Sequence, residues 1–366
     1  MKNSSVSYPW SNAPIIGALL TIKIVGALFA TLVFARFSPL IDADLYLRGF
    51  YVADVHLRTR IINVLAVSLS GIGGELFAHV IFGCISSAGL IYYFINGGKR
   101  WMLALTLLLP SSIIWTSIVG KEAIFFGGFT LVLVVWTRYV AGVFNRKDLI
   151  AGLFAFGVCA LLRPHYAVVL VWLFFSVTLI KKFGDKALPI LMAGIVIACF
   201  AVYVVIWSEL LRRGFSAIEP SARASRFQLF GIDPGTLEGL EQFKQWVPLG
   251  FIVGIVGPLP AEVMRRPEFA PFFIEGIFIL LFPFFLFRYA NQRITKGQKL
   301  FSRIYIWCLM PAIVALMAIH APFGILNPGS ATRWRTNFEA IFYMTPLWLF
   351  FYFIDDDRHE NSTLSS

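Results

Sequence analysis

Long apolar runs recur along this chain of 366 residues, and they limit its fold more than any other feature. A helix needs about 20 apolar residues to cross the hydrocarbon core of a bilayer, because each residue advances it by about 1.5 Å. Helices also satisfy their own backbone hydrogen bonds, which lipid cannot do for them. Charged residues make up 14% of the chain, whereas soluble domains carry about 25%. The sequence therefore predicts an all-α, polytopic integral membrane protein embedded in a lipid bilayer.

We expect about ten membrane-spanning helices in a single transmembrane domain over 1–354, followed by a polar C-terminal tail over 355–366. The expected spans lie near 14–35, 75–95, 101–119, 123–136, 149–162, 166–180, 187–207, 269–287, 304–319 and 338–354. The apolar run at 61–70 is short and is followed by Gly71, Gly73 and Gly74, so it predicts a helix in the membrane interface after the first external loop. A second short run, 246–260, contains Gly and Pro and predicts a re-entrant or interfacial segment.

Lysine and arginine gather in the turns that follow the second, fourth, sixth and eighth expected spans. The positive-inside rule places such turns in the cytoplasm, so both termini are expected there. The external loops are then 36–60, 208–268 and 320–337. The same turns account for the net charge of +11, and we expect no nucleic-acid partner. The four cysteines lie inside apolar runs and predict neither a disulfide framework nor a metal site.

Several ionisable groups at the external ends of spans are not explained by the positive-inside rule. They are Asp42, Asp44 and Arg48 of the first external loop, Lys121 and Glu122, Arg163 and His165, and Arg333 and Arg335. Ionisable side chains at such places usually mark a binding or catalytic site. The sequence therefore predicts one shared site on the external face, built from separate parts of the chain.

Each group also has a structural interpretation. Asp42 and Asp44 are either ordinary loop acids or site residues, and in a helix two residues so close cannot share a face. Asp44 is the first choice, because Tyr46 and Arg48 follow it closely, and Asp42 is the second.

The basic groups likewise have two interpretations. Lys121 and Glu122 suit an interfacial turn, Arg163 and His165 a corner between helices, and the Arg333–Arg335 segment an interfacial anchor. Arginines at these positions also suit an anionic headgroup. His79 lies one helical turn after Glu75, and for this pair a structural hydrogen bond is favoured over a role in the site.

The acidic first external loop and the basic outer ends of the spans resemble the GT-C superfamily of membrane glycosyltransferases. The segment 110–122, with its Pro-Ser-Ser, Trp, Ser and Lys-Glu positions, is similar to bacterial surface-polysaccharide membrane proteins, among them lipid-carrier-dependent transferases and repeat-unit polymerases. The resemblance implies that Asp44 or Asp42 is the base that activates the acceptor. It also implies that Lys121, Arg163, Arg333 and Arg335 hold the polyprenyl phosphate of the donor.

The expected function is a glycosyltransferase of the bacterial inner membrane that assembles a surface polysaccharide or glycolipid. Its partners are then a polyprenyl-phosphate-linked sugar donor and a glycan or glycolipid acceptor. A repeat-unit polymerase, a lipid-linked oligosaccharide transporter and a non-enzymatic assembly scaffold stay open; a transporter is expected to show internal repeats and charges at mid-membrane depth. No cofactor is expected, and the residues leave the participation of a divalent metal open.

Overall fold

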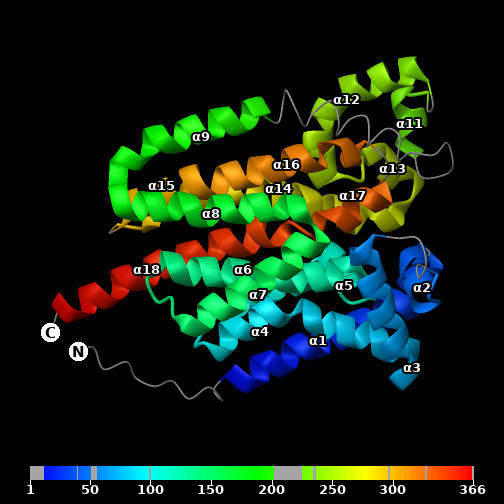
Figure 1. Cartoon of the computed structure of the whole chain (residues 1–366), viewed down its shortest axis with the longest axis horizontal. Coiled ribbons are helices and arrows are strands. Elements are labelled where there is room, and N and C mark those ends of the chain that lie inside the picture. The colour runs from blue at the N-terminus through cyan, green and yellow to red at the C-terminus, as the bar shows by residue number, and fades with distance from the viewer. Residues whose placement is uncertain are drawn as a thin grey trace. The chain divides into compact units, whose positions relative to one another are not determined.

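The computed structural model describes residues 12–38, 40–50, 56–98, 100–201, 225–233, 236–295, 297–325 and 328–364, and every regular element in these ranges is a helix (Figure 1). Six helical segments are long and apolar enough to cross a membrane, judged by length and composition: Ala13–Arg36, Leu57–Ser86, Lys121–Val140, Pro164–Phe200, Pro267–Arg293 and Gln298–Pro322. The predicted class, an all-helical membrane protein, is confirmed, with fewer such segments in the described part than the ten expected. The contacts divide the chain into two compact units, 1–167 and 168–366.

The third expected span, 101–119, is not one continuous helix. It consists of a 3₁₀ helix, η3 (Trp101–Leu108), a short helix, α5 (Pro110–Trp115), and a non-helical link over 116–120. Pro110 begins α5, where its missing amide hydrogen is tolerated, and a proline at this point prevents one uninterrupted helix. The segment therefore falls short of a continuous span although its composition is apolar.

Unit 1 contains α1 (Ala13–Leu32), α2 (Ile41–Leu47), α3 (Leu57–Ser86), α4 (Ala88–Ile95), α5, α6 (Lys121–Val140) and α7 (Arg146–Leu162). Helix α6 packs against α7, α4 and α3, while α1 packs against α3 and α5. Gly127 allows α6 to approach α3 closely, because a Cβ atom at this position would lie 2.2 Å from the carbonyl oxygen of Ile85 in α3. Small residues commonly permit such contacts between membrane helices.

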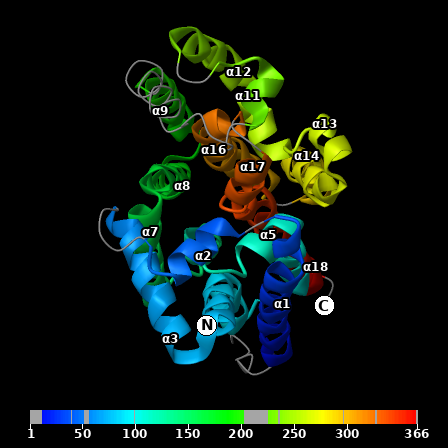
Figure 2. The same ribbon diagram turned by 90° about the vertical axis from the view of Figure 1, so that its right-hand side faces the viewer.

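Helix α3 is kinked at Gly74, whose backbone lies in the left-handed region with φ 83° and ψ 174°. Glycine adopts this conformation without a steric penalty. The part before the kink runs across the end of unit 1, whereas α1, α4, α6 and α7 run along it (Figures 1 and 2). One face of this part exposes Leu57, Ile61 and Val64 and the other buries Ile62. The break predicted from the three glycines is confirmed.

Unit 2 contains most of α8 (Pro164–Phe183), which begins in unit 1, and the helices after it. They are α9 (Ala187–Ala201), α11 (Ser225–Phe230), α12 (Leu237–Val256), α13 (Pro260–Arg265), α14 (Ala270–Arg293), α15 (Gln298–Arg303), α16 (Met310–Gly324), α17 (Pro328–Arg335) and α18 (Thr345–Leu364), with π-helical turns η7 (Ile304–Leu309) and η8 (Ala340–Met344). The end of the seventh expected span and the first part of the loop predicted over 208–268 lie outside the described residues.

The structure adds a helical conformation to two segments of unit 2. Residues 246–256 of the run 246–260, expected to be re-entrant or interfacial, form the second half of α12, which contains Pro248, packs along α16 and is not among the six segments long and apolar enough to cross a membrane. Phe243 and Val247 of α12 form a buried core with Ile325, so tertiary packing supports this helix despite its proline. The tail expected over 355–366 continues α18 as a helix as far as Leu364.

Candidate functional site

Three helices of the described structure begin side by side at one end of unit 1. The Lys121 Nζ at the start of α6 donates a hydrogen bond of 2.8 Å to the Thr59 Oγ1 in the first turn of α3. Arg163, immediately before α8, forms an ion pair of 3.0 Å with Glu122 of α6. Helix N-termini carry partial positive charge and unsatisfied N–H groups, so their convergence favours a bound anion.

Basic side chains add to this positive end. Arg58 of α3 acts electrostatically on both Lys121 and His165, and Arg163 acts on both as well. Arg163 is buried, with its guanidinium 5.5 Å from the centroid of the Phe125 ring. We call Arg58, Lys121, Arg163 and the paired Glu122 the basic cluster. The cluster contains three cations and one carboxylate, so its net formal charge is positive and suits a phosphate.

Helix α2 is held next to the basic cluster by Tyr46. The buried Tyr46 ring lies 6.0 Å from the Lys121 Nζ, and its backbone carbonyl accepts a hydrogen bond of 2.8 Å from Asn63 of α3. The same short helix carries Asp42 and Asp44 in its first turn. The structure therefore places the predicted acids of the first loop and the predicted cations Lys121 and Arg163 in one region of unit 1.

The two aspartates differ in their surroundings. Asp44 is exposed and Asp42 is half-buried, in agreement with the expectation that they do not share a face. Asp44 acts electrostatically on His79 of α3, a buried residue whose Nδ1 accepts a hydrogen bond of 2.9 Å from the Val119 amide. His79 thus has the structural hydrogen bond that the sequence favoured. Arg48 is exposed and ends α2, with its amide donating to the Asp44 carbonyl at 3.0 Å.

Arg333 and Arg335 belong to unit 2, which is described on its own. Arg335 is completely buried and donates to Glu275 of α14 at 2.6 Å and to the carbonyls of Ile255 and Gly257 at 2.8 and 3.1 Å. This side chain therefore ties α17 to α14 and to the end of α12. Arg333 is half-buried, and burial lowers the pKa of its guanidinium to about 10, so it keeps its charge at neutral pH.

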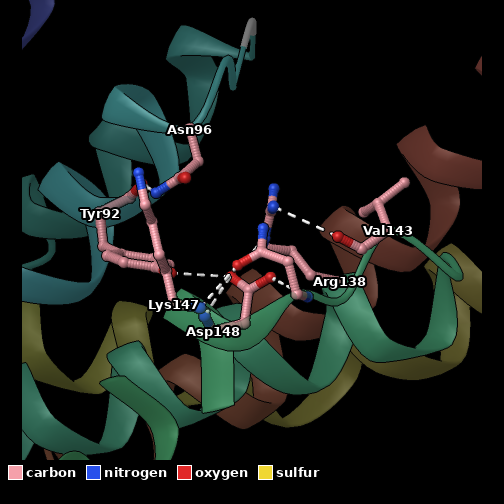
Figure 3. Close-up of polar contacts among 7 residues, drawn as sticks. Tyr92, Asn96, Arg138, Val143, Lys147 and Asp148 are labelled. Carbon is pink, nitrogen blue, oxygen red and sulfur yellow. Dashed lines mark hydrogen bonds and ion pairs between the residues drawn. The ribbon is translucent and has the colours of Figure 1, made fainter. Parts of the chain in front are cut away.

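A second polar group lies at the other ends of α6 and α7, around Asp148 (Figure 3). The buried Asp148 carboxylate accepts hydrogen bonds from Tyr92 at 2.8 Å, from Arg138 at 2.7 Å and from the Asn145 amide at 2.8 Å. Burial acts to raise the pKa of Asp148, but these hydrogen bonds together hold that pKa below its usual value. The arrangement joins α4, α6 and α7 and serves their packing.

Sequence reasoning missed three features of unit 1. Arg58 lies in the charged first loop, but the sequence does not mark it as a site residue, because only the fold shows that it lies at the start of a helix beside Lys121. Asp148 has a local signal, since Asn145 and Asp148 form a reciprocal cap at the start of α7. Lys23 has the clearest signal: it is a charged residue inside the first apolar run.

Comparison of the chain with protein-family models, with curated proteins and with solved structures gives no match. The residues that the structure describes contain no group of three or more His, Cys, Asp or Glu side chains able to hold a metal ion. The basic cluster and the acids of α2 are the predicted site residues that the structure brings into one region of unit 1.

Proposed function

We propose that this protein is a membrane glycosyltransferase that uses a polyprenyl-phosphate-linked sugar. The observation that carries the proposal is the basic cluster at the convergence of three helix starts. The cluster belongs to helices long and apolar enough to cross a membrane, so the anion that suits it best is one attached to a lipid. A polyprenyl phosphate joins an apolar chain to such an anionic group.

The residues near the cluster suit the two chemical needs of glycosyl transfer. Lys121 and Arg163 bind the phosphate and stabilise the negative charge that grows on it as the sugar leaves. Glu122 orients Arg163 through their ion pair. A carboxylate of α2 takes the proton of the acceptor hydroxyl, and Asp44, which is exposed on this helix, is our first choice with Asp42 second.

The membrane, the orientation of the chain and the number of crossings are also part of the proposal. Lysine and arginine gather in the turns after the second, fourth, sixth and eighth expected spans, and the positive-inside rule favours a cytoplasmic location for these turns. The basic cluster lies at the opposite ends of the helices, so we place it on the external face. We place the protein in a bacterial inner membrane with both termini in the cytoplasm, with about ten crossings and a GT-C-like arrangement. Its product is a surface polysaccharide or glycolipid.

Binding of the donor is tested with the full chain in lipid nanodiscs, using tryptophan fluorescence to follow titration with a long polyprenyl phosphate and with the matching polyprenol. We expect the phosphate to bind and the alcohol not to. Lys121→Gln and Arg163→Gln should each weaken phosphate binding about tenfold or more, because each removes a charge-assisted contact. Lys147→Gln is the matched control, since Lys147 is exposed at the other end of unit 1. Equal binding of the two lipids would refute the proposal.

Catalysis is tested by profiling the surface glycans of cells that carry only a variant chain. Asp44→Asn should abolish the product, whereas Asp233→Asn, at an exposed aspartate of unit 2, should leave it intact. Membrane insertion is checked for each variant by its expression and accessibility. Unchanged glycans in both the Asp42→Asn and the Asp44→Asn cells would remove the base from the mechanism. Accumulation of single repeat units would identify the reaction as polymerisation.

A further inference from the structure

Lys23 lies in the interior of α1 and is completely buried in unit 1. The rest of this candidate membrane span is strongly apolar. A charged side chain inside such a span is costly, so its presence there indicates a specific role. Its ammonium group donates a hydrogen bond to the Thr116 Oγ1.

Thr116 begins the non-helical link between α5 and α6, residues 116–120, which we call the α5–α6 link. Non-helical backbone at membrane depth is tolerated where neighbouring groups satisfy it. In this link the Thr116 hydroxyl donates to the Ser112 carbonyl at 2.5 Å, and the Val119 amide donates to His79 at 2.9 Å. The link is thus attached to α1 through Lys23 and to α3 through His79.

Two glycines bring α1 and α3 against the same stretch of backbone. A Cβ atom on Gly26 would lie 2.6 Å from the Ser117 Oγ and 2.8 Å from the Ile113 carbonyl oxygen. A Cβ atom on Gly83 would lie 3.4 Å from the Ser117 Cα. The link therefore has little room to move toward α1 or α3, and its position is set by these contacts and by the Lys23 hydrogen bond.

The residue after the link is Lys121, followed by Glu122, and these are two members of the basic cluster. We propose that Lys23 is a positioning residue, which fixes the α5–α6 link from within unit 1 and thereby sets where Lys121 and Glu122 enter the basic cluster. The inference rests on the proposed function insofar as it assigns a phosphate to that cluster. The proposal that Lys23 fixes the α5–α6 link does not depend on any ligand.

The test compares Lys23→Met, which removes the charge and the donor, with Lys23→Gln, which keeps an N–H donor. Thr116→Val removes the acceptor at constant shape. Thr21→Val is the matched control, because the Thr21 hydroxyl is exposed and bonds to Gly17 of its own helix at 2.9 Å. Hydrogen exchange of the peptide 116–122 and affinity for the polyprenyl phosphate are measured on the full chain in nanodiscs.

Lys23→Met and Thr116→Val should each raise exchange in 116–122 about tenfold, with the middle of α6 unchanged, because a hydrogen bond to a charged group is lost. Both should weaken phosphate binding about tenfold, and Lys23→Gln should recover part of each loss. Thr21→Val should change neither.

Unchanged exchange in a folded Lys23→Met protein overturns the inference, and so does raised exchange with wild-type affinity. If Lys23→Met does not fold, Thr116→Val decides between these outcomes. If the wild-type chain binds no phosphate, the proposed function fails, while the exchange data still decide whether Lys23 holds the link.

Discussion

Replacing Glu275 by Gln should destabilise the protein strongly, because it leaves the Arg335 charge buried without its carboxylate. The two side chains are 0% and 1% exposed and lie 2.6 Å apart. Removing one partner of a buried ion pair typically costs about 3–5 kcal/mol. Arg335 keeps its hydrogen bonds to two backbone carbonyls, each worth about 1 kcal/mol. We therefore expect a loss near the lower limit, about 3 kcal/mol.

The measurement is equilibrium unfolding of the full chain in mixed micelles. A second Arg–Glu pair of unit 2, Arg266 with Glu268 at 2.7 Å, is the internal control because its side chains are 46% and 32% exposed. Glu268→Gln should cost less than about 1 kcal/mol. The double variant Glu275→Leu with Arg335→Met should regain most of the stability, since it removes both buried charges. Equal losses for Glu275→Gln and Glu268→Gln would refute the argument from burial.

Two further predictions concern the packing of unit 1. Asp148→Asn should cost about 1–3 kcal/mol at neutral pH. Because the fold lowers the pKa of Asp148, the difference from wild type should be full above the usual aspartate pKa of about 4 and should be lost progressively as the pH falls from there through the lowered pKa of the folded state, which unfolding measured from neutral pH down to about pH 2 will check. Gly127→Ala should lower the stability of the protein by about 1–3 kcal/mol, because the added methyl group meets the Ile85 carbonyl oxygen. Gly157→Ala should not lower it, because the space around Gly157 is open, and thermal unfolding of both variants will check the difference.

The class of the protein and the break in α3 could be predicted because both depend on local sequence. Long apolar runs are sufficient to indicate membrane helices, and three glycines within four residues are sufficient to indicate a break. The proximity of Lys121 and Arg163 was also predictable, since successive spans return to the same face. The sequence indicates which end of a helix each residue occupies, and this information was sufficient to predict that Lys121 and Arg163 lie at the same end of unit 1.

The remaining features depend on contacts between distant residues. Glu275 and Arg335 are 60 residues apart, and nothing local distinguishes this buried arginine from the half-buried Arg333. Pro110 explains the break between η3 and α5 locally, but the non-helical link after α5 is held by Lys23 and His79, which lie on other helices. Helix α12 likewise keeps its helical form because α16 packs along it, which its own proline and glycines do not indicate.

The kink at Gly74 is a pivot for the first part of α3, whose first turn holds Thr59. Fifteen residues at about 1.5 Å each place Thr59 about 22 Å from the pivot. A rotation of about 10° at Gly74 therefore moves the Thr59 hydroxyl by about 4 Å, more than the length of its hydrogen bond to Lys121. A change in the kink angle at Gly74 therefore changes the geometry at the start of α6.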